Sequence, residues 1–379
     1  MRTVKTFIEL MLVLLASFLI ANTFSPIGES VSVEPFTGRL KHLFFLPNSP
    51  LILGDFSHRE EVAIRVWSLN DGKLTKSIRL GPKEGVESLA VSHDGDMVAV
   101  ATFLTETVGC YSLKENKWLW KSKWVERSPF TAKKVLFLQG DRAIVAFGQK
   151  QYVIYDAKKG EITVTKAKPL DEYAALGVCG RFYAPSPSGR YIMVWQGLCN
   201  PGHGVLKRFL FLNRKATIWD FQKDEPVARW ERTHEICAAA FSPDEKEIVI
   251  GSCDGHVSVR SLSDEKITRS WRAHTNAKYP DSNLQLTAMV FSNDGRFLAT
   301  YGDWEDGWDG VKVWDYCEGK LVHGFNKVHG PSFGDEATYP MAFSPDGKYF
   351  ALEQQGNLCL YDTQTWQEKW CVPSWEEGK

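Results

Sequence analysis

The densest set of potential ligands in the sequence is the acidic segment DWEDGWD, from Asp303 to Asp309. It offers several carboxylate oxygens over a short stretch, and hard cations such as calcium prefer oxygen ligands. Its spacing does not match an EF-hand loop, because it has no Asp at the third position and no Glu at its end. We therefore predict a solvated acidic turn with no bound metal, and a calcium site is the alternative.

Histidine and aspartate residues recur in the second half of the chain and could form acid–base pairs. They recur at regular places instead of gathering at one, which favours a structural network over a catalytic site. Four common catalytic or phosphate-binding patterns are also absent: G-x-S-x-G, H-E-x-x-H, a phosphate loop and G-x-G-x-x-G. We therefore assign no catalytic, metal-binding or cofactor-binding residue, and we expect no cofactor.

One sequence signature recurs along the chain: an apolar stretch, Ser-x-Asp-Gly or a near copy, and a second apolar stretch. Its copies begin at Ala90, Ala184, Ala240, Val290 and Ala342, with weaker ones at Leu43 and Leu136. Asp, Asn and Gly favour tight turns, and alternating apolar residues favour strands with one buried face. Each copy therefore predicts two strands joined by a turn.

A second signature follows each copy: a short alternating strand, usually ending in an aromatic residue, then a polar turn and another strand. Its seven instances lie at Trp67, Tyr111, Tyr155, Trp219, Arg260, Trp314 and Tyr361. Their spacing fits the roughly 40–45 residues of a four-stranded blade, with insertions in the longer intervals. The sequence therefore predicts an all-β, seven-bladed β-propeller, in which each blade is a four-stranded antiparallel sheet and stacking buries its faces.

These repeats resemble the WD40 repeat family over nearly all the chain after the N-terminal segment. The resemblance implies a hydrogen-bonded tetrad of His, Ser or Thr, Asp and Trp, formed in the sixth blade by His274, Thr300, Asp309 and Trp314. The fifth blade has His234, Ser252 and Asp254, with Arg260 in the Trp position, and the seventh has His329, with Tyr361 in that position. The ring shows no sign of a closing blade shared between the two ends of the chain. Pairing of residues 31–39 with the last blade is left open.

The N-terminal segment has the character of an export or anchoring signal. Arg2 and Lys5 precede an uncharged apolar run from Leu10 to Ala21, shorter than the roughly 20 apolar residues of a membrane span. Glu9 and the absence of a clean A-x-A cleavage site leave an uncleaved anchor open. We therefore predict a signal peptide or membrane anchor at residues 1–29 and a propeller at residues 30–379. We expect the protein to be periplasmic, extracellular or membrane-anchored, with a cytoplasmic location disfavoured.

The eight cysteines are scattered and form no C-x-x-C pair, which disfavours a compact zinc site. If the chain is exported, Cys179 and Cys199 are the first candidates for a disulfide. The alternative is that the cysteines pack as small buried hydrophobic residues.

Four insertions are expected to project from one face of the propeller. They are Gln196 to Lys215, Asn276 to Gln285, Asp303 to Asp309 and Lys327 to Ala337. In a propeller, the loops between second and third strands and those between blades emerge on the same face. Insertions in repeat proteins often map to the binding face.

These insertions hold aromatic and basic residues of the kind that anchor protein interfaces. They include Tyr279, Trp304, Trp308, Phe333, Lys207 and Arg208. We therefore predict a monomeric, non-enzymatic scaffold that binds a protein or peptide partner here, unless the aromatic residues instead cover the pore mouth. The alternative function is a propeller enzyme, a metal-dependent hydrolase or cofactor-dependent dehydrogenase, acting at the central pore. A net charge of -1 disfavours nucleic acid as a partner, and membrane contact is expected only through the N-terminal segment.

Overall fold

The structure is a computed structural model of the whole chain. It describes residues 39–57, 62–80, 85–102, 105–124, 132–138, 140–148, 151–167, 181–196, 215–231, 236–252, 254–275, 285–303, 310–325 and 339–374. The chain divides into two compact units, Met1–Phe36 and Thr37–Lys379, and every described residue lies in the second. The signal or anchor predicted at residues 1–29 lies outside the described residues. Within the described part of the chain, no helix is long and apolar enough to cross a membrane.

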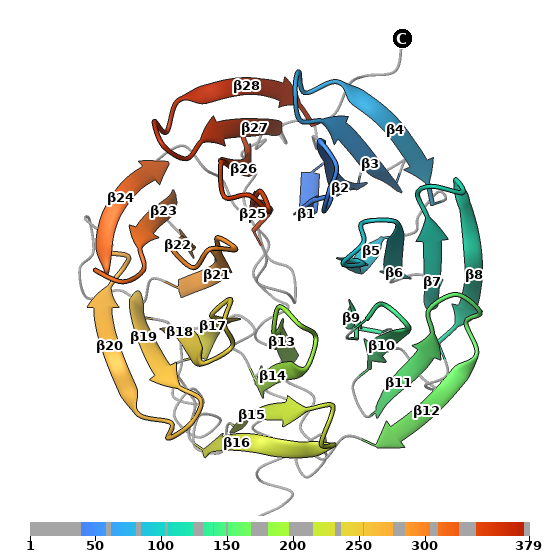
Figure 1. Cartoon of the computed structure of the whole chain (residues 1–379), viewed down its shortest axis with the longest axis horizontal. Coiled ribbons are helices and arrows are strands. Elements are labelled where there is room, and N and C mark those ends of the chain that lie inside the picture. The colour runs from blue at the N-terminus through green and yellow to red at the C-terminus, as the bar shows by residue number, and fades with distance from the viewer. Residues whose placement is uncertain are drawn as a thin grey trace, which may run out of the picture. The chain divides into compact units, whose positions relative to one another are not determined.

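The described residues form seven four-stranded antiparallel sheets, each built from four consecutive strands, which stand in a ring as seven blades (Figure 1). Blades 1 and 2 comprise β1 (Arg39–Phe45), β2 (Leu51–Ser57), β3 (Val62–Ser68), β4 (Leu74–Arg79), then β5 (Val86–Val91), β6 (Met97–Thr102), β7 (Thr107–Ser112), β8 (Lys117–Lys123). Blades 3 and 4 comprise β9 (Lys134–Phe137), β10 (Ala143–Phe147), β11 (Gln151–Asp156), β12 (Ile162–Ala167), then β13 (Arg181–Pro185), β14 (Tyr191–Gln196), β15 (Lys215–Asp220), β16 (Glu225–Glu231). Blades 5 and 6 comprise β17 (Ile236–Phe241), β18 (Glu247–Ser252), β19 (His256–Ser261), β20 (Ile267–Arg272), then β21 (Gln285–Phe291), β22 (Phe297–Asp303), β23 (Gly310–Asp315), β24 (Lys320–Phe325). Blade 7 comprises β25 (Met341–Phe343), β26 (Tyr349–Gln354), β27 (Asn357–Asp362) and β28 (Glu368–Pro373). The predicted all-β, seven-bladed propeller is confirmed.

The Ser-x-Asp-Gly signature forms the turn between the first and second strands of a blade. The serine hydroxyl donates to the aspartate two residues later, over 2.6–2.7 Å, in the turns that begin at Ser92, Ser242, Ser292 and Ser344. The same carboxylate oxygen accepts a backbone N–H two residues further on, at 3.0–3.2 Å. Gly95 adopts a φ of +78° at the fourth position, a conformation that glycine reaches at little cost. These aspartates therefore fix the turn and are not free for chemistry.

Neighbouring turns of this kind also touch one another around the ring. His93, in the turn of blade 2, places Nδ1 2.8 Å from Asp141 Oδ1 in blade 3 and Nε2 3.2 Å from the carbonyl oxygen of Pro187 in blade 4. The hydrogen bond with Asp141 is the largest cause that raises the pKa of His93 above its ordinary value. Three consecutive blades are thus tied together at these turns.

A register shift recurs at the same place in all seven blades. It lies between the third and fourth strands, immediately before the residue of the second sequence signature, such as Trp67 in blade 1 or Trp314 in blade 6. The shift leaves one extra residue on the fourth strand, which is a β-bulge and increases the local twist. The seven instances of the signature therefore occupy equivalent positions, as predicted.

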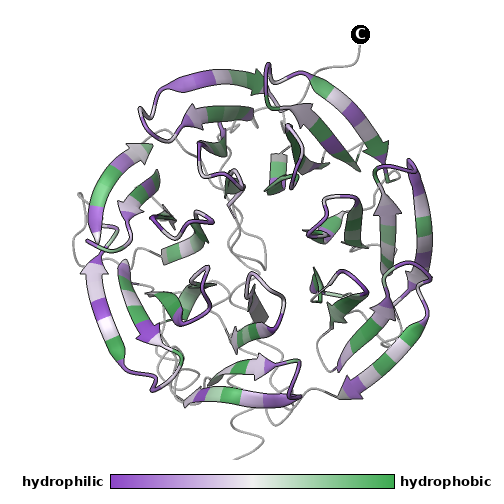
Figure 2. Ribbon diagram, viewed as in Figure 1, coloured by the Kyte–Doolittle hydropathy of each residue, from purple (hydrophilic) through white to green (hydrophobic). Residues whose placement is uncertain are grey.

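The hydrophobic core is divided into seven clusters, one between each pair of adjacent blades. Figure 2 shows hydrophobic segments along the strands and hydrophilic turns joining them. The cluster between blades 6 and 7, for example, packs Tyr301 and Val313 against Phe343 and Phe350. Each blade therefore buries both of its faces only because it has two neighbours.

Among the described residues, no strand is exchanged where the ring closes, because blades 1 and 7 each consist of four strands of their own. Arg39 pairs with Ser57 inside blade 1, and residues 31–38 lie outside the described residues. Closure depends on a seam of side-chain contacts between blades 7 and 1, in which Leu43 and Trp67 pack in one cluster with Leu360. The prediction of complete blades at both ends is confirmed for the described strands.

Candidate functional site

One face of the ring carries the ends of the second and fourth strands of every blade, because these two strands run in the same direction within an antiparallel sheet. The four predicted insertions begin on this face. They follow β14, β20, β22 and β24, and thus connect strands of blades 4 to 7. We call this the connection face. The ring therefore gathers connections that are far apart in sequence onto one surface.

The residues predicted to bind a partner all belong to these connections. Tyr279, Trp304, Trp308, Phe333, Lys207 and Arg208 lie outside the described residues. Their role in binding stays a prediction. The calcium alternative for the acidic segment also stays untested, because residues 304–309 are not described.

Two strands of blade 6, β22 and β23, meet the segment after β20 at a buried hydrogen-bonded group. His274 Nε2 lies 2.7 Å from Thr300 Oγ1, and Trp314 Nε1 donates to the same oxygen over 2.9 Å. His274 and Thr300 are fully buried, and Trp314 is nearly so. These bonds have the pattern that the family resemblance implies for three of the four tetrad members. Asp309, the fourth, lies outside the described residues.

The fifth blade has a variation on this arrangement. Ser252 donates to the carboxylate of Asp254 and, over 3.0 Å, to the carbonyl oxygen of His256. Arg260, in the position of the tryptophan, lies with its guanidinium 5.9 Å from the centre of the Trp230 ring. Because Trp230 lies on β16, an aromatic contact between blades 4 and 5 accompanies the substitution. His234 lies outside the described residues.

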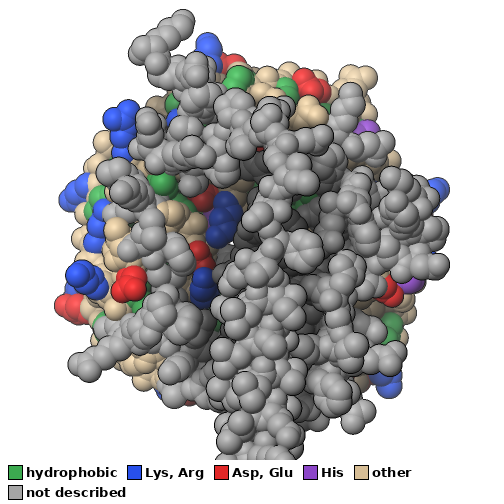
Figure 3. All heavy atoms as spheres, turned by 180° about the vertical axis from the view of Figure 1, so that it is seen from behind, with side chains coloured by type: hydrophobic (Ala, Val, Ile, Leu, Met, Phe, Trp, Pro, Cys, Tyr) green, Lys and Arg blue, Asp and Glu red, His purple; other side chains and the backbone are tan. Residues whose placement is uncertain are grey.

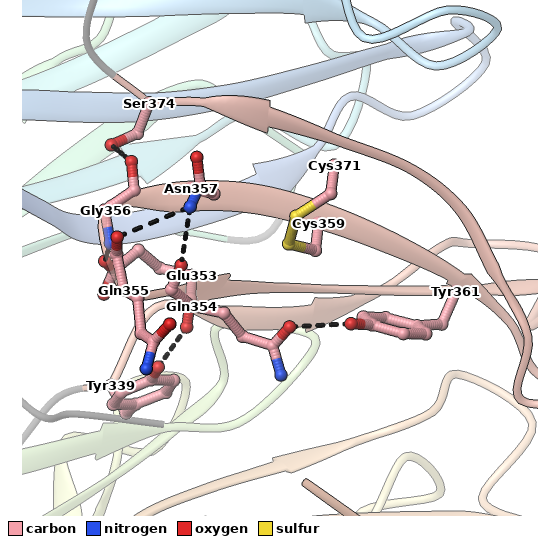
Figure 4. The surroundings of a disulfide bond; sticks show 10 residues. All are labelled: Tyr339, Glu353, Gln354, Gln355, Gly356, Asn357, Cys359, Tyr361, Cys371 and Ser374. Atoms are coloured by element: carbon pink, nitrogen blue, oxygen red, sulfur yellow. Dashed lines mark hydrogen bonds between the residues drawn. A yellow bond between two sulfur atoms is a disulfide. The ribbon is translucent and has the colours of Figure 1, made fainter. Parts of the chain in front are cut away.

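The seventh blade uses a phenol where blade 6 uses an indole. The Tyr361 hydroxyl donates to Gln354 Oε1 over 2.6 Å, as Figure 4 shows. Burial is the main cause that raises the pKa of Tyr361 to about 12, so the phenol remains a hydrogen-bond donor at neutral pH. His329, which the resemblance places near this group, is outside the described residues. Blades 5 and 7 therefore replace the tryptophan by different means.

A buried histidine–carboxylate pair lies in blade 1, where His42 in the middle of β1 lies beside Asp55 of β2. Asp55 Oδ2 lies 3.2 Å from His42 Nδ1, and Asp55 Oδ1 accepts the backbone N–H of His42 over 2.6 Å. Only 5% of His42 and 1% of Asp55 is exposed. Burial alone would raise the pKa of Asp55, but the charge and hydrogen bonds of His42 outweigh burial, and the net pKa lies below the ordinary value.

His42 Nε2 is buried and has no hydrogen-bond partner among the residues that the structure describes. An imidazole held through Nδ1 by a carboxylate, with Nε2 free, has the arrangement of a general base. The sequence did not indicate this pair, because the family resemblance places the histidine ahead of the first strand of a blade. His42 instead lies inside β1, where the register with β2 shifts between Leu40 and Leu43.

Charged residues of blades 1 to 3 surround the start of the inner strands. Glu87 binds two lysines: Lys133 Nζ lies 2.5 Å from its Oε1, and Lys41 Nζ donates to its carbonyl oxygen over 2.9 Å. Figure 3 shows Lys or Arg and Asp or Glu side chains near the centre of one face of the molecule. Glu87 of blade 2 therefore links blade 1 and blade 3.

The structure contains a disulfide between Cys359 on β27 and Cys371 on β28 (Figure 4). Cys237 is disulfide-bonded as well, whereas Cys110 and Cys317 are free. Sulfur atoms bonded to each other do not act as thiolate ligands, so the nearby carboxylate of Glu368 does not complete a metal site in this oxidised form. The cysteines first suggested as a pair, Cys179 and Cys199, lie outside the described residues.

Comparison with known proteins supports the repeat type and the fold. The family model for the WD40 repeat, described as WD domain, G-beta repeat, matches residues 225–261. This stretch runs from β16 of blade 4 through the first three strands of blade 5. Its position shows that the sequence repeat is offset by one strand from the structural blade.

Two solved structures share the fold at low sequence identity. The β-propeller domain of Myceliophteria thermophila Cps50 (Swd1) superposes with a TM-score of 0.62 at 13% identity, over 86% of this chain and 97% of that one. Kuenenia stuttgartiensis hydrazine synthase superposes with a TM-score of 0.63 at 13% identity, over 89% of this chain and 99% of that one. At this identity the likeness extends to the fold alone. The chain is thus a seven-bladed β-propeller, and the WD40 repeat model matches one stretch of it, residues 225–261.

Proposed function

We propose that this protein is a non-enzymatic scaffold that binds a protein or peptide partner through its connection face. The observation that carries the proposal is the shared position of the four predicted insertions, which all leave the ring on this face over blades 4 to 7. Loops held on a rigid scaffold commonly carry function. Their aromatic and basic residues have the composition of interface anchors.

We further propose that the propeller works outside the cytoplasm or on a membrane. The apolar run after Arg2 and Lys5 supports export or anchoring. The disulfide between Cys359 and Cys371 supports an oxidising compartment, because disulfides persist there and are rare in the cytosol. Cell fractionation, with mass spectrometry of the mature N-terminus, tests this directly. A soluble cytosolic protein with an intact N-terminus would contradict it.

The binding proposal is tested by comparing three full-length proteins as baits in the extract of the source cell. They are the wild type, a variant with Tyr279, Trp304 and Trp308 changed to Ala, and a control with Ile267 and Leu321 changed to Ala. The control residues are exposed apolar side chains on the outer strands β20 and β24. A partner that the wild type and the control retain and the first variant loses, while all three keep the same circular dichroism, would support the proposal. Equal retention by all three would reject the connection face as the site.

A second candidate function, an enzyme acting at the central channel, depends on one observation, the His42–Asp55 pair. Its free Nε2 is suited to accept a proton, but this atom is closed to solvent in the structure, which ranks the function second. The test is hydrolysis of chromogenic carboxylic and phosphoric esters by the full-length protein. A general base would lose about 100-fold or more in rate on His42→Gln. Lys41→Gln is the control, and absence of any turnover, or equal rates in both variants, would remove this candidate.

A further inference from the structure

The Cys359–Cys371 disulfide joins residues that lie directly opposite each other in the β27–β28 ladder. β28 is the outermost strand of blade 7, and its one sheet neighbour is β27. Without the disulfide, only hydrogen bonds to β27 would hold this edge strand within its sheet. The disulfide therefore fixes the position of β28.

β28 and the residue after it make contacts across the closing seam of the ring. Trp370 Nε1 donates to the carbonyl oxygen of Leu69 over 2.9 Å. The guanidinium of Arg65 donates to the carbonyl oxygen of Ser374 over 2.8 Å, and both residues are buried. Val372 packs in the seam cluster. Because no strand is exchanged between blades 1 and 7, the position of β28 bears directly on closure.

The two sulfur atoms differ in their access to solvent. Cys359 is fully buried, with 0% of the residue exposed, whereas Cys371 is an exposed residue on the outer strand. Thiol–disulfide exchange proceeds by attack of a thiolate on one sulfur, with the other sulfur leaving, so access decides which sulfur is attacked. Exchange is therefore directed to Cys371.

We propose that the Cys359–Cys371 disulfide is a redox-active site that a dithiol reductant opens at Cys371. We propose further that the intact disulfide acts as a clasp, which holds β28 in place at the closing seam between blades 7 and 1. A thiolate of the reductant attacks Cys371 Sγ, which forms a mixed disulfide and releases Cys359 as a thiolate that takes a proton from water. The second thiol of the reductant then forms the reductant's own disulfide and releases Cys371. The protein gains two electrons and two protons, and the dithiol loses the same number.

The site of attack is mapped with glutathione as the probe, added to the folded full-length protein and followed by acid quenching and peptide mass spectrometry. We expect the glutathione adduct on Cys371 and a free thiol at Cys359. An adduct on Cys359, or none on either residue under folded conditions, would overturn the proposal. A Cys317→Ser background removes the exposed free cysteine and its own adduct from the map.

The clasp is tested by amide hydrogen exchange with and without dithiothreitol. We expect exchange in β28 to accelerate by about tenfold or more on reduction, because the opened strand end can separate locally from the sheet. β24 is the internal control, since it is the equivalent outer strand of blade 6 and no disulfide of the described residues joins it to β23. Unchanged exchange in β28, or an equal increase in β24, would contradict the clasp.

Two variants keep this test decisive. A Cys237→Ser background removes the one further disulfide-bonded cysteine among the described residues, so that among these residues reduction acts on blade 7. The double variant Cys359→Ala with Cys371→Ser should show fast β28 exchange whether or not dithiothreitol is present. If that variant does not fold, the comparison of oxidised and reduced wild type still decides the question. None of these measurements needs a partner, so they are independent of the proposed scaffold function.

Discussion

Thr300 lies at the centre of the buried group of blade 6, and changing it to Val tests whether that group stabilises the fold. Valine has nearly the same shape but no hydroxyl, so Trp314 Nε1 and His274 Nε2 each lose the partner they have at 2.9 and 2.7 Å. Each buried polar atom left without a partner costs about 1–3 kcal/mol. The added methyl group returns about 0.8 kcal/mol. We therefore expect Thr300→Val to lower the free energy of unfolding by about 1–5 kcal/mol.

The assay is urea unfolding of the full-length protein, followed by tryptophan fluorescence and by far-UV circular dichroism. Thr300→Ser is the matched control, because it keeps the hydroxyl and loses only a methyl group, at a cost of about 1 kcal/mol. A loss below about 1 kcal/mol for Thr300→Val would refute the reasoning, because two unsatisfied buried groups cost more than that. Equal losses for the two variants would show that packing, and not the hydroxyl, matters at this position.

Three further predictions concern pH and backbone conformation. Because the pKa of Asp55 is lowered in the folded state, its carboxylate stabilises the fold above its unfolded pKa of about 3.9, and this stabilisation is lost as pH falls through the folded pKa. Asp55→Asn removes the titrating group, so its urea midpoint should depend less on pH than that of the wild type below about pH 4. The raised pKa of His93 has the opposite effect on the pH dependence of stability: protonated His93 stabilises the fold below about pH 6.5, and this stabilisation is lost as pH rises through the folded pKa. Because the His93 side chain is half exposed, we expect His93→Gln to change the pH dependence of the urea midpoint only slightly. Gly255 has a φ of +82°, and an added Cβ would strike the backbone of His274, whereas Gly356 has a φ of +81° and open space around it. Gly255→Ala should therefore destabilise the protein by clearly more than the roughly 1–3 kcal/mol of backbone strain expected for Gly356→Ala, and equal urea midpoints would refute the close approach.

The sequence was sufficient to predict the seven blades because the signals are local and repeated. A turn such as Ser292 to Gly295 and a strand end such as Trp314 each specify a short structure, and their spacing supplies the number of units. The positions of the insertions relative to the strands could be predicted for the same reason. Hydrophobic alternation then predicts which strand faces are buried.

Contacts that depend on register or on long range could not be predicted in this way. The disulfide between Cys359 and Cys371 depends on which residues of β27 and β28 face each other, and a bulge shifts this register between Leu360 and Tyr361. The bond between Arg65 and Ser374 joins residues more than 300 positions apart and carries no local signature. The His42–Asp55 pair could not be predicted because no sequence signature marks a histidine inside a first strand, and the contact depends on the register of β1 with β2.

The absence of an exchanged strand has a consequence for the order of assembly. Each blade is contiguous in sequence, so a blade can form and dock on its predecessor as the chain emerges during synthesis. Blade 1 cannot bury the side that carries Leu43 and Trp67 until blade 7, the last to be made, is complete. The incomplete ring therefore exposes two apolar sides during synthesis. One is the seam side of blade 1, which stays exposed throughout, and the other is the outer side of the most recently made blade. A chain that stops within the final blade would keep the seam side of blade 1 open to other chains, so premature termination there should produce an aggregating protein even though most of the ring is present.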